Sequence, residues 1–369
     1  MRTANALPRL FATVVGLGFL FALTAADAQA EVNFKGKKVQ IVVPSKEGGG
    51  SDRMGRLFQP FFHQYLPGKP TTIVVNKPGG SGVKGSNWFE RDAPRDGTAI
   101  FSTGTSVYTS YLFAGKKVKY DLKGWNPILL APFGTCFYAR QETGVTGKNI
   151  VSDIKALQKK DRLLMGAKNP TSSELRAFLP YDILDIKGAK PVYGLSSGGR
   201  RKGTQRGELQ LGVDSTIKCR KEIKKLKEQY GVISYMTLGF VGEDGKITRD
   251  PAFPELPHVL EAYKQVNGKE LTGMKLKTLK SFINMTVTGN KTLWLPKGVS
   301  EEVQQTYVAT LKKIFRDAQF KKLTAKTLGV YPQSIGKKAK KAVMDAIDFS
   351  PETMKWMNGW IKEKMVGAS

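Results

Sequence analysis

Cysteine and histidine are scarce: the 369 residues include only two cysteines, Cys136 and Cys219, and two histidines, His63 and His258. Two cysteines are too few for a disulfide scaffold or a cysteine-built zinc site, and they either form one bridge or remain buried thiols. Neither histidine has another histidine, a cysteine or an acid at a spacing typical of metal ligands. The usual general base of hydrolases is therefore scarce, although lysine or carboxylate bases remain as alternatives. We predict a protein without a metal or other cofactor, and not an enzyme.

Long apolar runs are missing after residue 30, where no segment approaches 18 consecutive apolar residues. Before that point, an apolar run at residues 10–23 follows two arginines and precedes small residues that end at Ala30. It is about 14 residues long, whereas a membrane-spanning helix needs roughly 20. This pattern is typical of a secretory signal peptide. We expect residues 1–30 to be cleaved and the mature chain to reside in the periplasm, a compartment that permits a disulfide.

Acidic residues are few: 31 aspartates and glutamates stand against 59 lysines and arginines, for a formal net charge of +28. This charge favours anionic partners without identifying them. Three basic clusters, residues 200–202, 218–227 and 337–341, lack the interleaved aromatic side chains of nucleic-acid-binding surfaces. We interpret them as solvated faces and expect no nucleic-acid partner. The remaining composition, 40% hydrophobic and 24% charged, is typical of a globular protein with two or three domains.

Three short apolar segments predict buried strands, and each is followed by a loop of small polar residues. The strand and loop pairs are 39–43 with 48–52, 72–75 with 76–82, and 99–102 with 103–106. Ligands of open α/β sheets bind beside the carboxyl ends of the strands, where such loops lie. Glycine frees backbone amides at helix N-termini, and the helix dipole favours an anion there. A carboxylate would suit these loops, whereas a nucleotide would not, because the lysine of a phosphate-binding loop is missing.

Further elements indicate a second α/β domain. Strands are expected at 163–166, 209–213 and 232–238, a polar loop at 169–173, a lysine-rich helix at 218–230, and a helix capped by Ser300. In the first domain the apolar spacing predicts a helix over 51–65 that starts at Ser51 or Asp52. Pro60 should kink this helix or end it early.

The glycine loops carry a family resemblance. Residues 41–44 (Ile-Val-Val-Pro), 48–52 (Gly-Gly-Gly-Ser-Asp) and 74–82 (Val-Val-Asn-Lys-Pro-Gly-Gly-Ser-Gly) resemble the N-terminal signature of the tripartite tricarboxylate transporter receptors, also called Bug solute-binding proteins. Residues 95–97, 166–175, 192–199, 207–215, 254–262 and 293–299 resemble further segments of the family. Glu174 stands where the family commonly has histidine, and Gln210 where it has aspartate.

The resemblance implies an α/β, two-lobed fold of the type II periplasmic-binding-protein kind, with a ligand cleft between the lobes. Lobe 1 would comprise residues 31–133 and 288–369, and lobe 2 residues 134–287. Such a receptor would capture a small carboxylate and deliver it to the integral-membrane permease subunits of the transporter, and we expect a monomer. A ligand-presenting sensor subunit for a membrane signalling kinase and an exported α/β enzyme are the alternatives.

The same resemblance assigns the ligand contacts to loops of both lobes. Loops of lobe 1 would bind the proximal carboxylate through amides, partly through ordered waters, and hydroxyl groups of lobe 2 would bind the distal end. The predicted ligand-binding residues are Gly48, Gly49, Gly50, Ser51, Asp52, Gly79, Gly80, Ser81, Gly82, Thr103, Gly104, Thr105, Ser106, Thr171, Ser172, Ser173 and Asp214. Lys46, Lys168 and Arg200 either add a charge-assisted contact or face solvent.

Overall fold

Two mixed β-sheets organise the part of the chain that the structure, a computed structural model, describes: residues 32–242 and 245–367. The predicted signal peptide lies outside these residues. The first sheet has six strands and the second has five, and helices pack on the strands of both. The α/β class predicted from the sequence is therefore confirmed.

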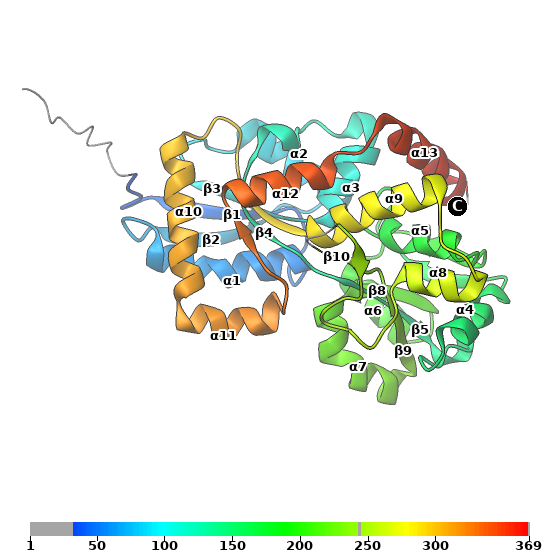
Figure 1. Cartoon of the computed structure of the whole chain (residues 1–369). Helices are drawn as coiled ribbons and strands as arrows, with labels where there is room; N and C mark the ends of the chain where they lie inside the picture. The colour runs from blue at the N-terminus through cyan, green and yellow to red at the C-terminus, as the bar shows by residue number, and fades with distance from the viewer. Residues whose placement is uncertain (1–31, 243–244, 368–369) are drawn as a thin grey trace, which may run out of the picture. The chain divides into compact units, whose positions relative to one another are not determined.

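The first sheet has the strand order β13, β4, β12, β3, β1, β2, and Figure 1 labels β1, β2, β3 and β4 of this sheet. These strands are β1 Lys38–Val43, β2 Thr71–Asn76, β3 Ala99–Gly104, β4 Asn126–Ala131, β12 Lys291–Leu295 and β13 Ser334–Ile335. Strand β1 lies between β2 and β3 and is parallel to both, so the loops after these three strands emerge at the same edge. Strand β12 is inserted between β3 and β4, antiparallel to both. The three strands predicted for the first domain are confirmed.

Several helices pack on the first sheet or on one another beside it: α1 Gly50–Tyr65, α2 Val83–Asp92, α3 Thr105–Phe113, α10 Glu301–Arg316, α11 Ala318–Thr327 and α12 Lys337–Ile347. Helix α1 continues through Pro60 to Tyr65, so the predicted early end is wrong. Proline removes one backbone donor, and the burial of Phe58 and Phe62 on either side offsets that loss. The Ser300 side chain accepts a hydrogen bond from a first-turn amide of α10, as predicted.

The second sheet has the strand order β7, β6, β8, β5, β9, and Figure 1 shows its elements in green. Its strands are β5 Thr135–Arg140, β6 Leu163–Gly166, β7 Ala189–Val192, β8 Leu211–Ser215 and β9 Val232–Thr237. The helices of this region are α4 Ile150–Gln158, α5 Leu175–Ile183, α6 Ser197–Gln205 and α7 Thr216–Tyr230. The strands at 163–166 and 232–238 and the helix at 218–230 are confirmed, whereas the strand at 209–213 lies two residues later.

The remaining elements follow the second sheet or end the chain. Strands β10 Phe240–Val241 and β11 Ile247–Thr248 form a hairpin, and helices α8 Val259–Asn267, α9 Gly273–Ile283 and α13 Pro351–Ile361 complete the described part of the chain. Both histidines have structural partners. His258 is the N-cap of α8, and His63 Nδ1 hydrogen-bonds with the Pro70 carbonyl at 2.8 Å.

The chain passes between the two sheets at two adjacent points. The first crossing lies between β4, which belongs to the first sheet, and β5, which belongs to the second. The return runs through the π-helical turn Asn284–Thr288 into β12. The Phe133 amide donates to the Val287 carbonyl at 3.0 Å and ties the two crossings together. Residues from Asn33 onward form one compact unit, so the predicted lobe boundaries stay a prediction.

Candidate ligand-binding site

The first predicted loop is held by a buried carboxylate. Asp52 is only 1% exposed and accepts hydrogen bonds from the Gly48 amide (2.8 Å), Asn76 Nδ2 (2.9 Å) and Arg56 Nε (3.0 Å). Burial raises the pKa of Asp52, but the hydrogen bonds from Arg56, Asn76 and Gly48 outweigh it and hold that pKa below its ordinary value. The Asp52 carboxylate thus joins the first loop to the end of β2. Gly49 is the N-cap of α1, so Ser51 and Asp52 lie in the first turn rather than at the predicted cap.

The second loop has a backbone that few residues other than glycine adopt. Four consecutive residues have positive φ angles: Gly79 (140°), Gly80 (54°), Ser81 (58°) and Gly82 (106°). This conformation brings the hydroxyl of Ser81 to Asn169, whose Nδ2 donates to Ser81 Oγ at 2.8 Å. The second loop therefore contacts the polar loop that follows β6.

The third loop makes the same kind of contact through Ser106. Lys168 Nζ donates to Ser106 Oγ at 2.7 Å, and the Ser173 amide donates to the same oxygen at 3.4 Å. Ser106 precedes these residues by more than sixty positions, and the strands that place them belong to different sheets. The predicted loops of the first sheet and the 168–173 loop of the second are thus in direct contact.

Not every predicted residue of the third loop is directed toward this contact. Thr103 is fully buried, and its Oγ1 accepts a hydrogen bond from Trp294 Nε1 at 2.8 Å. Thr105 is 3% exposed, and its Oγ1 has no hydrogen-bond partner among the described residues. The side chain of Thr103 therefore belongs to the packing between β3 and β12.

Glu174 organises the loop after β6. It is 1% exposed and accepts hydrogen bonds from the hydroxyls of Ser172 and Ser173, both at 2.7 Å. It also forms an ion pair with Arg200, which is 7% exposed. Although burial raises the pKa of Glu174, the charges of Arg200 and Lys168 dominate and hold it far below its ordinary value. Two of the three hydroxyls predicted to meet a ligand from this loop, those of Ser172 and Ser173, are therefore directed at Glu174.

Three further cations lie close to this loop. Lys168 is half-buried, Arg176 in the first turn of α5 is 9% exposed, and Lys291 at the start of β12 is half-buried. Their charges interact: burial first, then the charges of Arg176, Lys168 and Arg53, lower the pKa of Lys291 to about 7. Among the described residues none of these three cations forms an ion pair with an acid. We call Lys168, Arg176 and Lys291 the cation cluster.

The three cations predicted either to contact the ligand or to face solvent, Lys46, Lys168 and Arg200, differ in their exposure. The solvated face predicted for Arg200 is wrong, because Arg200 is buried in its ion pair with Glu174. Gly166 provides the space, since a side chain there would fall 2.6 Å from Arg200 Cγ. Lys168 also turns inward, whereas Lys46 is exposed. Sequence reasoning missed Arg176 and Lys291, which no motif marks, and it placed Asn169 in the polar loop 169–173 but not among the ligand contacts.

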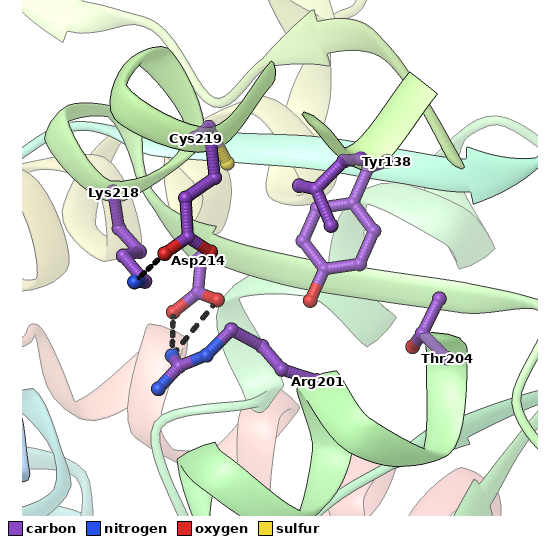
Figure 2. A pocket seen from close by; sticks show the side chains of 8 residues that line it. Tyr138, Arg201, Thr204, Asp214, Lys218 and Cys219 are labelled. Atoms are coloured by element: carbon purple, nitrogen blue, oxygen red, sulfur yellow. Dashed lines mark hydrogen bonds and ion pairs between the residues drawn. The ribbon is translucent and has the colours of Figure 1, made fainter. Parts of the chain in front are cut away.

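Asp214 lies in a different environment, shown in Figure 2. Its carboxylate accepts two hydrogen bonds from Arg201 Nη1, both at 3.0 Å. The surrounding cavity has a volume of about 10 Å³, room for no more than one water. Cys219 lines this cavity; Cys219 and Cys136 are both buried and unbridged. The two-thiol alternative therefore holds in this structure, and the cavity is too small for a solute.

A larger hollow of about 260 Å³ is lined by Lys280, Asn284, Asp345, Asp348 and Phe349, among others. Two carboxylates in its lining make it a poor match for an anion.

The described residues contain no group of three potential metal-ligating side chains and no helix long and apolar enough to span a membrane.

Comparison with solved structures places this geometry in a known fold. A TctC solute-binding protein from Polaromonas aligns with a TM-score of 0.58 and 17% identity, covering 88% of this chain and 98% of that one. The periplasmic binding protein BugD aligns with a TM-score of 0.62 and 20% identity, covering 90% and 97%. The chain has the two-lobed fold of these binding proteins.

A third alignment is to a Rhodopseudomonas palustris protein solved with adipate, at a TM-score of 0.65 and 16% identity, covering 89% of this chain and 97% of that one. No family model matches the sequence, and no curated protein matches it. At these identities the likeness concerns the fold, and the predicted resemblance to the tripartite tricarboxylate transporter receptors, or Bug proteins, is confirmed at that level.

Proposed function

We propose that this protein is a periplasmic receptor that binds a small carboxylate at the loops after β1, β2, β3 and β6. The observation that carries the proposal is the contact between those loops: Ser106 accepts from Lys168, and Ser81 accepts from Asn169. The loop pattern of the first sheet suits an anion, and the family resemblance implies ligand contacts from both sets of loops. A carboxylate held there would meet residues from both sheets, which is how a two-lobed receptor encloses its solute.

The electrostatics of the site support an anion. Helices α1 and α3 begin at Gly50 and Thr105, and the first amides of a helix have no partners within it. These amides and the positive end of the helix dipole favour a carboxylate. The cation cluster adds positive charge. The carboxylates that act on it among the described residues, Glu174 and Asp214, are already paired with Arg200 and Arg201. An anionic solute would therefore compensate charge that the described part of the protein leaves uncompensated.

Delivery to the permease subunits of a tripartite transporter, as a monomer, is the second part of the proposal. It is supported by the fold shared with TctC and Bug binding proteins. The solved relative with adipate supports a carboxylate ligand. Capture of membrane partners from cells that express the chain distinguishes a transporter permease from a signalling kinase.

A binding role also fits the chemistry of Ser106 and Lys168 better than catalysis does. A hydroxyl beside a lysine is one arrangement that activates a nucleophile. Here, however, Lys168 Nζ donates to Ser106 Oγ, and the Ser173 amide donates to the same oxygen, so the hydroxyl acts as an acceptor twice. Recovery of an unchanged ligand after incubation supports binding, and conversion of the ligand would establish an enzyme.

Thermal-shift screening tests the carboxylate proposal. The full chain is expressed with its N-terminus, purified after export, and screened against a library of carboxylates with their uncharged amides as controls. Stability should rise by about 2.7 kcal/mol at a hundredfold excess over the dissociation constant for a few acids, and not for their amides. A shift with nucleic acid or another polyanion, without a shift for any acid, contradicts the proposal.

A further inference from the structure

The charge balance of the candidate site is incomplete. Arg200 and Glu174 neutralise each other, whereas no ion pair with an acid is present for Lys168, Arg176 or Lys291 among residues 32–242 and 245–367. Lys168 has a serine hydroxyl as its partner, and Lys291 has the Asn290 side-chain oxygen. Buried charges are costly unless an opposite charge accompanies them.

Lys291 occupies space that two glycines leave open. In the antiparallel pairing of β12 with β3, Lys291 lies directly opposite Gly104. A side-chain carbon built on Gly104 would fall 2.8 Å from Lys291 Nζ and 2.9 Å from Ser51 Oγ, and one on Gly50 would fall 3.1 Å from Lys291 Cε. The Lys291 ammonium therefore lies between the start of α1 and the start of α3, where the proposed carboxylate binds.

The immediate neighbours of this ammonium offer it little compensation. Lys291 Nζ donates to Asn290 Oδ1 at 2.7 Å and lies 5.6 Å from the centroid of the Phe133 ring. These are a neutral acceptor and an aromatic face, each a weaker partner than a carboxylate.

Arg176 supplies an independent observation. Its side chain is 9% exposed, and its Nε is buried without a hydrogen-bond partner in the described residues. Most buried guanidinium groups are hydrogen-bonded, so an unpartnered donor in a cationic region indicates a missing acceptor. Arg176 is the neighbour whose charge acts most strongly on Lys291.

We propose that Lys168, Arg176 and Lys291 form a subsite of side-chain cations that holds a second anionic group of the solute. This inference rests on the proposed function of the same site. The glycine-loop amides bind one carboxylate, and the side-chain cations bind the other group, which is a carboxylate, phosphonate or sulfonate. Charge-assisted hydrogen bonds from lysine and arginine suit all three.

Binding of the second group is coupled to proton uptake at Lys291. The charged groups that face its ammonium are Arg53 from α1, Lys168 from the loop after β6 and Arg176 from α5, all of them positive. Burial and these charges leave the pKa of Lys291 at about 7, so at pH 8 the ammonium has largely lost its proton. An anion beside it favours the protonated form and raises that pKa, so one proton enters with the solute.

Calorimetry with adipate and its half-amide, adipamic acid, tests the subsite, because the two probes have the same length and differ by one charge. The wild-type protein should bind adipate at least about tenfold more tightly than the half-amide. Lys291→Met should remove most of this preference. Lys313→Met removes an exposed lysine of α10 and should leave it unchanged. Arg176→Gln tests the same subsite if the first variant fails to fold.

The same titrations, repeated at pH 8 in buffers of different ionisation enthalpy, count the protons taken up. Wild-type protein should take up close to one proton per adipate, and Lys291→Met close to none. The affinities of phosphonate and sulfonate analogues of adipate then show which second anionic group binds most tightly. Equal affinity for adipate and its half-amide, or a preference that survives both substitutions, overturns the subsite while leaving carboxylate binding intact. Failure of every acid to bind overturns the proposed function itself.

Discussion

Phe133 and Val287 are joined by a backbone hydrogen bond of 3.0 Å at the place where the chain leaves the first sheet and returns to it. Asn290 reinforces this link, since its Nδ2 donates to the Phe133 carbonyl at 3.2 Å. Asn290 is 2% exposed, so water does not replace the bond when it is lost. Both crossings are thereby fixed to one another by the backbone and by one buried amide.

Removal of this amide should destabilise the protein. Asn290→Ala leaves the Phe133 carbonyl without its side-chain donor, and the free energy of unfolding should fall by about 1–3 kcal/mol. Urea unfolding of wild type and variant, followed by circular dichroism, measures the difference. Asn267→Ala, at the exposed end of α8, is the matched control. Equal stabilities of wild type and Asn290→Ala would show that this amide does not hold the crossings.

Ser106 should affect ligand binding more than stability. Ser106→Ala removes the acceptor of Lys168, a half-buried cation that then lacks its hydroxyl partner. Affinity for the best acid of the screen should fall by about tenfold, while the unfolding midpoint changes little. Calorimetry and thermal unfolding measure the two effects, with Ser281→Ala on α9 as the control. An unchanged affinity would separate Ser106 from the binding site.

Glu174 should make the protein sensitive to acid. Its pKa is depressed in the folded state, so its contribution to stability is present above the unfolded pKa of about 4.3 and is lost as the pH falls below that value. Glu174→Gln leaves Arg200 buried without its partner and should lower stability at pH 7 by about 3–5 kcal/mol. Denaturant unfolding from pH 7 to pH 3 should show the two proteins converging in stability as the pH falls, and parallel curves would refute this.

Asp250 should have the opposite pH dependence. It is fully buried, Tyr331 donates to its Oδ1 at 2.5 Å, and its Oδ2 has no partner among the described residues. Burial raises the pKa of Asp250 despite that hydrogen bond, so its stabilising contribution is present below the unfolded pKa of about 3.9 and is lost as the pH rises through the folded value. Asp250→Asn should be about 1 kcal/mol more stable than wild type at pH 8. Denaturant unfolding of both proteins at pH 8 measures the difference, and a variant that is no more stable than wild type at that pH would count against this.

The two thiols provide a direct chemical test. Cys136 and Cys219 are buried and unbridged, and burial raises the pKa of the Cys219 thiol, which suppresses the reactive thiolate. A thiol reagent should therefore label neither cysteine in the native protein and both in urea. If unfolding releases no reactive thiol, the exported protein contains a disulfide instead.

The parts of the structure that local sequence determines were predictable. The apolar strand at 39–43, the glycines that follow it and the Ser300 cap each depend on neighbours in sequence, so their patterns are read directly. Lys291 is different, because it reaches the site only through the pairing of β12 with β3, which joins residues far apart in the chain. No local pattern specifies that strand order.

Arg200 shows a second limit of sequence reasoning. Its cluster of basic residues is typical of a solvated face, and most of the helix α6 composition is polar. The side chain is nevertheless buried, because Gly166 leaves space and Glu174 supplies a charge. Both partners come from other segments, so the exception becomes visible only in three dimensions.

Asn290 and Lys291 are adjacent in the chain but perform different tasks. The Asn290 amide holds Phe133 at the crossing, while the Lys291 ammonium lies among the loops and donates to the same asparagine. A single peptide bond thus separates the ammonium of the proposed subsite from the amide that links the two crossings. A shift of the backbone at the crossing would therefore also move the Lys291 ammonium, so the position of the proposed subsite depends on the conformation of the crossing.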